Sequence, residues 1–195
     1  MRPNLLIRSL LWTWFFAALL VGRFALLQRV PAPAVQGTLL TLTALLVIAY
    51  KAWPAFHAWA DSLDLRAIVA LHLSRFVGFY FIYLYRHGAL PYAFAVPGGI
   101  GDVIVAAFAL VVVFGGFSRD TRRRLITIWN VVGLVDIIMV VVSAARLGLA
   151  DPASMRALTF LPLSLLPTFL VPLIIATHLL IFARIRGETA ATPQN

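Results

Sequence analysis

The chain has 195 residues, of which 62% are hydrophobic and 12% are charged, and it contains no cysteine. A soluble domain is about half apolar and about a quarter charged, so this composition excludes a water-exposed globule, a disordered chain and any disulfide or thiolate site. Lysine and arginine outnumber aspartate and glutamate by 16 to 7, but with no soluble domain to carry a basic face we expect no nucleic-acid partner.

Six apolar stretches follow one another along the chain, at residues 5–27, 37–53, 65–86, 100–117, 125–146 and 157–183. Crossing a hydrocarbon core ~30 Å thick takes ~20 apolar residues in a helix, whereas strands of a barrel would alternate over about ten residues. We therefore predict an all-α membrane protein, a compact bundle of about six transmembrane helices. Residues 1–186 would form this single domain, and residues 187–195 a disordered cytoplasmic tail.

The distribution of basic residues predicts the orientation of the bundle. With the N-terminus inside, 10 of the 16 Lys and Arg lie on the cytoplasmic side and 5 lie outside, with Arg75 within a span. Cytoplasmic loops carry an excess of these residues. We therefore expect both termini in the cytoplasm.

The third stretch contains most of the polar groups that are costly in lipid. At about 100° per residue, five of its side chains fall within about 80° of arc. They are His72, Arg75, Phe79, Tyr83 and Arg86. Charged groups within a span avoid lipid, so this stripe is predicted to face a cavity or other helices.

The fifth stretch supplies a counter-charge for Arg75. Asp136 lies near the middle of its span, as Arg75 does, and shares a helix face with Trp129 and Ser143. We predict that Arg75 and Asp136 pair, directly or through water. Two interpretations stay open: an ion pair that fixes helix register, or a gate or ligand clamp.

A Pro/Gly-rich segment precedes the predicted fourth helix. Proline and glycine between Arg86 and Asp102 interrupt any helix, while the intervening Tyr92–Val96 is too apolar for a solvated loop. This predicts a segment that dips into the outer leaflet under protein cover. Asp102 would cap the following helix or pair with Arg86, and the two would otherwise form a ligand site at the outer surface.

The last stretch contains three prolines at intervals of five, Pro162, Pro167 and Pro172. Each lacks an N–H and crowds the carbonyl four residues earlier, so an irregular helix is predicted. The freed carbonyls would bond to neighbours, to Ser164 and Thr168, or to water.

Two histidines suggest a cofactor hypothesis. His72 and His178 are expected at similar depth on two helices, the arrangement that b-haem ligation by two histidines requires, and Arg75 or Arg66 could bind the propionates. The alternative is that both are hydrogen-bonded packing residues. No motif of a known catalytic or metal-binding class occurs, so an enzyme is not favoured.

One run resembles a known group of proteins. Arg75-x-x-Gly78, followed by Arg86-x-Gly88-x-x-Pro91-x-x-Phe94-Ala95-x-Pro97-x-Gly99-x-Gly101-Asp102, is similar to a group of small uncharacterised bacterial inner-membrane proteins. The resemblance implies a multi-pass protein of the bacterial cytoplasmic (inner) membrane. It implies no activity.

The leading functional hypothesis is that an intramembrane cavity binds or passes a small or amphiphilic ligand. The residues predicted to bind or gate it are Arg75, Tyr83, Arg86, Asp102 and Asp136. One alternative is a redox module that holds b-haem or quinone, with His72 and His178 as haem ligands. Another is a non-catalytic subunit of a larger membrane complex. Membrane lipids are expected partners, and a homo-oligomer or a larger complex is the expected assembly.

Overall fold

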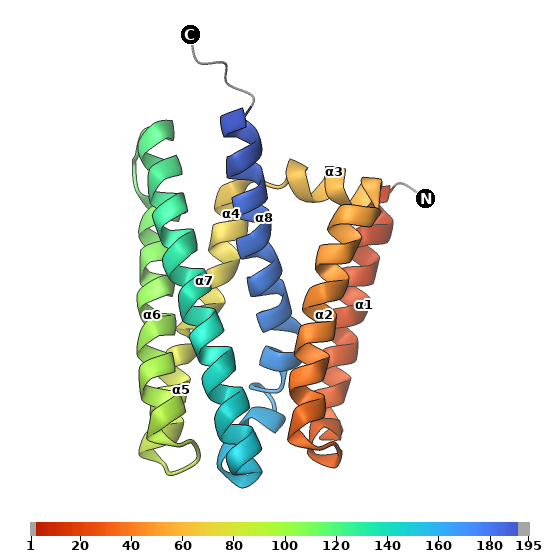
Figure 1. Ribbon diagram of the computed structural model, residues 1–195, viewed down its shortest axis with the longest axis vertical. Coiled ribbons are helices and arrows are strands. Elements are labelled where there is room, and N and C mark those ends of the chain that lie inside the picture. The colour runs from red at the N-terminus through yellow and green to blue at the C-terminus, as the bar shows by residue number, and fades with distance from the viewer. Residues whose placement is uncertain (1–2, 191–195) are drawn as a thin grey trace.

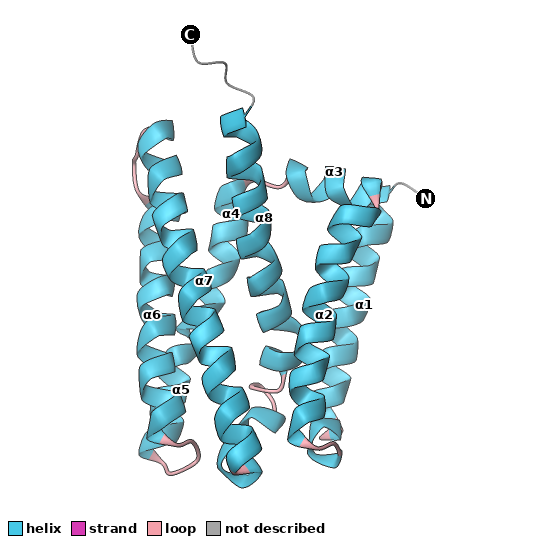
Figure 2. Ribbon diagram, viewed as in Figure 1, coloured by secondary structure: helices cyan, strands magenta, loops and turns pink. Residues whose placement is uncertain are grey.

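The computed structural model describes residues 3–190, and this part of the chain is made of helices and short connections without a strand (Figure 2). The first half contains α1 (Pro3–Arg23), η1 (Leu26–Arg29), α2 (Ala32–Ala52), α3 (Pro54–Ser62), α4 (Leu65–Leu71), η2 (His72–Phe76) and α5 (Val77–Arg86). The second half contains α6 (Tyr92–Phe114), α7 (Arg119–Ala150), η3 (Pro152–Thr159), η4 (Leu166–Leu170) and α8 (Val171–Ala190).

Six helical segments are long and apolar enough to cross a membrane, and they correspond to the six predicted stretches. They are Asn4–Arg23, Ala32–Ala52, Leu65–Arg86, Tyr92–Phe114, Arg119–Ala150 and Leu166–Gly187. Large apolar side chains lie on the outside of the bundle, as lipid requires; Trp12 is 60% exposed and Phe114 73%. The fold therefore supports a multi-pass membrane protein.

The helices form a bundle with two distinct ends (Figure 1). At the terminal end α1 begins, α8 ends and α3 lies across the bundle. The distal end carries η1, the α5–α6 turn and η3. The hairpin of α1 and α2 stands beside the group formed by α4 to α8. The two ends of the described chain thus share one side of the bundle, and the assignment of that side to the cytoplasm remains a prediction.

The third span is not a continuous α-helix, because the 3₁₀-helix η2 separates α4 from α5. A 3₁₀-helix turns about 120° per residue instead of about 100°, so the residues after it rotate away from the expected face. His72 and Arg75 are 0% and 1% exposed, whereas Phe79 and Tyr83 are 59% and 52% exposed. The prediction of one stripe from His72 to Arg86 is therefore wrong.

The Pro/Gly-rich segment is helical, which corrects the prediction of an irregular segment before the fourth helix. Helix α6 begins at Tyr92 and continues through Pro97. Proline deprives the Ala93 carbonyl of its helical donor, and the Ser143 hydroxyl of α7 donates to that oxygen at 3.3 Å. A neighbouring helix thus completes the hydrogen bonding that a membrane environment demands.

The glycines of this segment allow close packing of α5 against α6. A Cβ atom on Gly99 would lie 2.6 Å from the carbonyl oxygen of Gly78, and a Cβ on Gly78 would collide with the carbonyl oxygen of Gly99. The two backbones therefore touch with no side chain between them, as small residues permit in membrane bundles.

The irregular sixth span is confirmed. A 3₁₀-helix, a turn and the π-helix η4 precede α8. Pro172 leaves the Thr168 carbonyl without a helical donor, and the Trp14 indole Nε1 of α1 donates to it at 2.8 Å. At its other end α8 continues to Ala190, so residues 187–190 are helical instead of part of a disordered tail. Residues 191–195 lie outside the described residues.

Basic residues at the terminal end form hydrogen bonds between neighbouring helices. Arg122 of α7 donates to the carbonyl oxygens of Val112, at 2.7 Å, and Gly115, at 2.8 Å, at the end of α6. The next residue, Arg123, donates to the Ile185 carbonyl of α8 at 3.0 Å. The Arg122 guanidinium thus satisfies carbonyls that the end of α6 leaves without a helical donor, and Arg123 links the start of α7 to α8.

Candidate functional site

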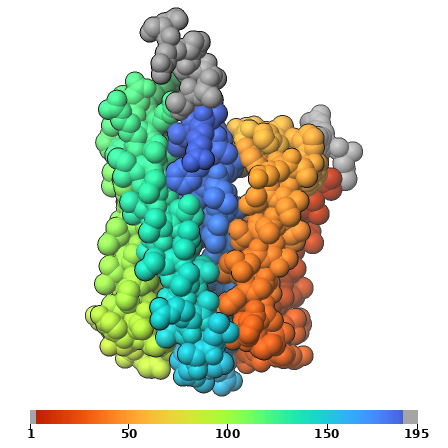
Figure 3. Space-filling model, in the orientation of Figure 1, coloured from red at the N-terminus to blue at the C-terminus, as the bar shows by residue number. Residues whose placement is uncertain are grey.

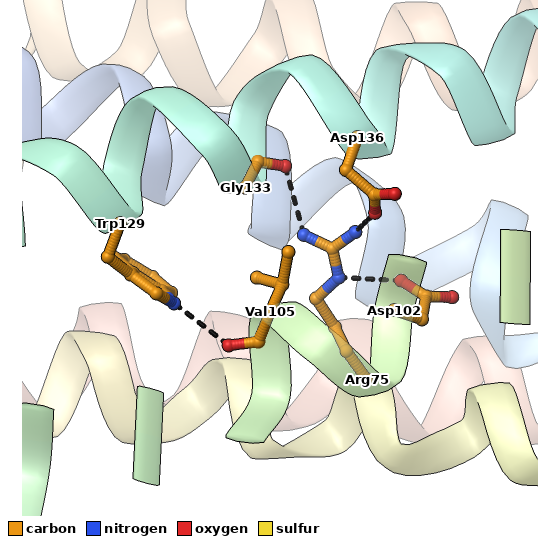
Figure 4. A network of polar contacts seen from close by, with 6 residues as sticks. All are labelled: Arg75, Asp102, Val105, Trp129, Gly133 and Asp136. Carbon is orange, nitrogen blue, oxygen red and sulfur yellow. Dashed lines mark hydrogen bonds and ion pairs between the residues drawn. The ribbon is translucent and has the colours of Figure 1, made fainter. Parts of the chain in front are cut away.

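Arg75 is the centre of a buried ion network at mid-depth in the bundle. Its Nε donates to Asp102 Oδ1 at 2.6 Å, and its Nη1 donates to the Gly133 carbonyl oxygen at 2.9 Å. Its Nη2 donates to Asp136 Oδ2 (Figure 4). The predicted pairing of Arg75 with Asp136 is confirmed, and a second carboxylate completes the network.

Asp102 is that second carboxylate, and it lies elsewhere than the sequence suggested. It is 3% exposed and bonds to Arg75, whereas Arg86 is exposed at the distal end of α5. The predicted Arg86–Asp102 contact at the outer surface is therefore wrong. The cause is the start of α6 at Tyr92, which carries Asp102 to the middle of its span. Tyr83 is also outside the network, with its ring 4.1 Å from that of His87.

Two glycines make room for the network. A Cβ on Gly101 would collide with Asp136 Oδ1, and a Cβ on Gly133 would lie 2.6 Å from His178 Cε1. Gly101 lets the carboxyl group of α7 lie against α6. Gly133 lets the His178 ring approach the turn of α7 whose carbonyl binds Arg75.

A layer of buried rings lies on the terminal side of Arg75. His72, Trp129 and His178 are all 0% exposed, and the two imidazole centroids are 4.4 Å apart. Asn130 Nδ2 donates to the His178 carbonyl at 3.0 Å, so its Oδ1 accepts from His178 Nδ1 at 2.8 Å. Thr177 donates its hydroxyl to its own helix and accepts from His72 Nε2 at 3.1 Å. His72 Nδ1 and His178 Nε2 are buried and have no hydrogen bond to any residue that the structure describes.

This geometry does not fit the predicted haem site. The two histidines share the expected depth, but their rings are in direct contact. Ligation by two histidines places the porphyrin between the imidazoles, and no space for a macrocycle separates them here. Both histidines have the hydrogen bonds of packing residues, which was the alternative interpretation. Among the described residues no group of three or more His, Asp or Glu is placed to hold a metal ion.

The face of α7 that was predicted to carry Trp129, Asp136 and Ser143 contacts α6 and the ion network. Trp129 Nε1 donates to the Val105 carbonyl at 3.0 Å, as Figure 4 shows. Two turns further on Asp136 joins the ion network, and Ser143 bonds to Ala93. Trp129 and Ser143 thus bond to two levels of α6, and Asp136 between them bonds to Arg75 of η2.

A cavity of about 310 Å³, called cavity A here, reaches the network from the distal end. Its deep end is formed by Ser74, Arg75 and Asp102, and residues of η1 and η3, among them Gln28 and Arg156, line it near the distal end. The walls between are mainly apolar; they include Leu39, Phe81, Phe94, Ile137 and Val141. The Ser74 hydroxyl at the deep end is buried without a hydrogen-bond partner.

A second cavity of about 530 Å³, cavity B, lies in the terminal half. It is bounded by the α1–α2 hairpin, α3, α4 and α8, and its lining is almost entirely apolar. Figure 3 shows an opening between α2 and α8 at this level. Tyr50 and Lys51 are among its lining residues, and none of the lining residues that the structure describes belongs to the ion network.

Fold and site together define a multi-pass helical membrane protein with an ion network at mid-depth and a cavity that ends on it. The chain belongs to the family described as Domain of unknown function (DUF8737), whose match covers residues 32–186. No curated protein and no solved structure matches the chain.

Proposed function

We propose that this protein binds a small or amphiphilic molecule in cavity A, within the bacterial inner membrane. Ligand sites are mostly apolar with a few polar groups that fix orientation, and their volumes start at about 300 Å³. Cavity A has this composition. The apolar part of the ligand would contact the walls, and its polar group would reach Ser74, Arg75 and Asp102.

The observation that carries this proposal is the Ser74 hydroxyl. It is buried at the deep end of cavity A beside Arg75, and no group within residues 3–190 bonds to it. Buried polar atoms are almost always hydrogen-bonded, since an unsatisfied one costs about 1–3 kcal/mol. A ligand oxygen or nitrogen at this position would satisfy the hydroxyl.

Binding is better supported than passage. On the terminal side of Arg75 the buried layer of His72, Trp129 and His178 fills the bundle. A molecule in cavity A would meet this layer before it reached the terminal end. Passage through the protein would require these rings to move.

The test is native mass spectrometry of protein extracted in a mild detergent, with two tryptophan variants on α7. Val141 lines cavity A, so Val141→Trp should fill it and remove a bound small molecule. Val135 on the same helix is 57% exposed, so Val135→Trp should retain the bound mass. The same bound mass in both variants would place the ligand elsewhere and contradict the proposal.

The same preparation tests the subunit hypothesis. A chain that purifies only with another protein at a constant ratio would support a subunit of a larger complex. A well-behaved monomer or homodimer that carries a small molecule would support ligand binding.

A further inference from the structure

The charges of the ion network do not balance. Arg75 is 1% exposed, and among the described residues it is the single cation bonded to the two carboxylates of Asp102 and Asp136. A guanidinium keeps its proton under all ordinary conditions. With both carboxylates ionised the network would carry one net negative charge at mid-depth in the membrane, which is costly.

Neighbouring groups do not supply the missing positive charge. His178 and His72 lie beyond Gly133, on the terminal side of Arg75. A proton on either free imidazole nitrogen would create a buried N–H with no acceptor, since both atoms lack a hydrogen-bond partner. Arg156 belongs to the distal end of cavity A. Compensation therefore has to come from within the carboxyl pair.

Asp136 is the member of the pair that is better placed to exchange a proton. Its side chain is 19% exposed, whereas the Asp102 side chain is 5% exposed and bonded to Arg75 Nε at 2.6 Å. Asp136 Oδ2 accepts from Arg75, so its Oδ1, which lies where Gly101 has no side chain, is the atom that can hold a proton.

We propose that the network of Arg75, Asp102 and Asp136 is a proton-binding site that holds one exchangeable proton, carried on Asp136 Oδ1. The step is the uptake of one proton by a carboxylate and its return to solvent, with no other bond made or broken. With the proton bound, Arg75 and ionised Asp102 form a neutral pair. The charge count uses only these three residues and requires no ligand in cavity A.

The test is infrared spectroscopy of the protein in lipid vesicles at neutral pH, where exposed carboxyl groups are ionised. The wild type should show the C=O band of a protonated carboxylic acid. Asp136→Asn should lose the band, and Asp120→Asn, at an exposed acid in the first turn of α7, should keep it. Absence of the band in the wild type, or its persistence in Asp136→Asn, would overturn the proposal.

Asp102→Asn keeps the test decisive if Asp136→Asn does not fold. With one carboxylate left, Arg75 and Asp136 would balance without a proton, so this variant should also lose the band. The double variant leaves Arg75 uncompensated, and its melting temperature should fall by more than the sum of the two single changes. If the melting temperature of the double variant falls by no more than the sum of the two single changes, the charge count is contradicted.

Two further measurements separate this inference from its alternatives. Replacement of Na⁺ by choline should leave the band unchanged, and a band present only without Na⁺ would assign the site to a metal cation instead. Val141→Trp should keep the band, because Val141 lines the apolar wall of cavity A and the three residues of the network are unchanged. Loss of the ligand with retention of the band would thus distinguish the two proposals.

Discussion

The three guanidinium nitrogens of Arg75 each have an acceptor, and the acceptors come from two helices. Asp102 is on α6, and Gly133 and Asp136 are on α7. The planar group is therefore held in one orientation between them (Figure 4). A lysine has a point charge on a flexible stem and could not reach the same three acceptors. Arg75 consequently joins three consecutive spans at mid-depth.

The first prediction concerns this residue. Arg75→Gln should lower the free energy of unfolding by about 3–5 kcal/mol, since it leaves buried carboxylates without their partner. Arg86→Gln, at an exposed position, should change it by less than about 0.5 kcal/mol. Denaturant-induced unfolding in detergent micelles measures both. Equal stability of the two variants would show that the network contributes little.

At the scale of elements, the α5–α6 crossing depends on the absence of side chains. A methyl group on Gly99 would meet the backbone of α5 at Gly78 and the side chain of Ile82 at 3.0 Å. Backbone cannot move aside as a flexible side chain can, so an added atom would push the helices apart. Because Asp102 follows one turn later, the crossing also sets the distance to Arg75.

We therefore expect Gly99→Ala to destabilise the protein by about 1–3 kcal/mol, the usual cost of overpacking. Gly37, in α2, has open space around its Cβ position, so Gly37→Ala should be neutral or stabilise by up to about 1 kcal/mol. Thermal unfolding of the two variants, followed by circular dichroism, provides the comparison. A stable Gly99→Ala protein would mean that α5 and α6 can separate without loss.

A second element prediction concerns the link between α1 and the sixth span. Trp14→Phe removes the donor to the Thr168 carbonyl and should cost about 1 kcal/mol. Pro172→Ala would restore a backbone N–H near that carbonyl, so the same change should cost less in this background. A double-mutant cycle measures the difference. Additive effects would contradict a shared carbonyl.

The sequence predicted the spans well because hydropathy depends on composition alone. It also predicted the Arg75–Asp136 pair, since equal depth on two spans is countable along the chain. It missed Asp102 as the third member, because proline and glycine near Asp102 indicated a broken helix. The Ser143 hydroxyl that completes the helix at Ala93 is 50 residues away in sequence.

The prediction that Tyr83 lies on the same face as Arg75 was wrong for a different reason. Nothing in the sequence of residues 72–76 distinguishes a 3₁₀-helix from an α-helix, yet these five residues rotate α5 by about 100° in total. The haem hypothesis was wrong because the rings of His72 and His178 lie too close together for a porphyrin between them. Depth along two helices is countable, but whether two rings touch or stand apart depends on how the helices pack.

At the scale of the whole molecule, both cavities border the α1–α2 hairpin. Cavity A lies between η1, α2 and the distal parts of η2, α7 and η3, and cavity B between the hairpin, α3, α4 and α8. The buried cluster of α5 to α8 forms the opposite wall of cavity A, where Phe81, Phe94, Ile137 and Ile174 are at most 2% exposed. The two spans of the hairpin are also the least buried of the six spans.

The last prediction concerns the orientation of the bundle. Because the sequence contains no cysteine, a single introduced cysteine is the one thiol that can react. Ala89→Cys, in the distal α5–α6 turn, should react with a membrane-impermeant maleimide in intact bacterial spheroplasts. Gly187→Cys, at the terminal end, should react only after lysis. Both positions are exposed, so accessibility differs only by side. The reverse pattern would place the termini outside.

Arg122 and Arg123 restrict the mutations by which the membrane orientation of this protein can change. In the predicted orientation their positive charges belong to the set that would keep this loop in the cytoplasm, while Arg122 caps the end of α6 and Arg123 bonds to Ile185 of α8. A substitution that removed the positive charge at either position would also remove hydrogen bonds between neighbouring helices. Arg119 and Arg124 are exposed neighbours. At these two positions, evolution or an engineer can change the charge of the loop while the hydrogen bonds of Arg122 and Arg123 stay intact.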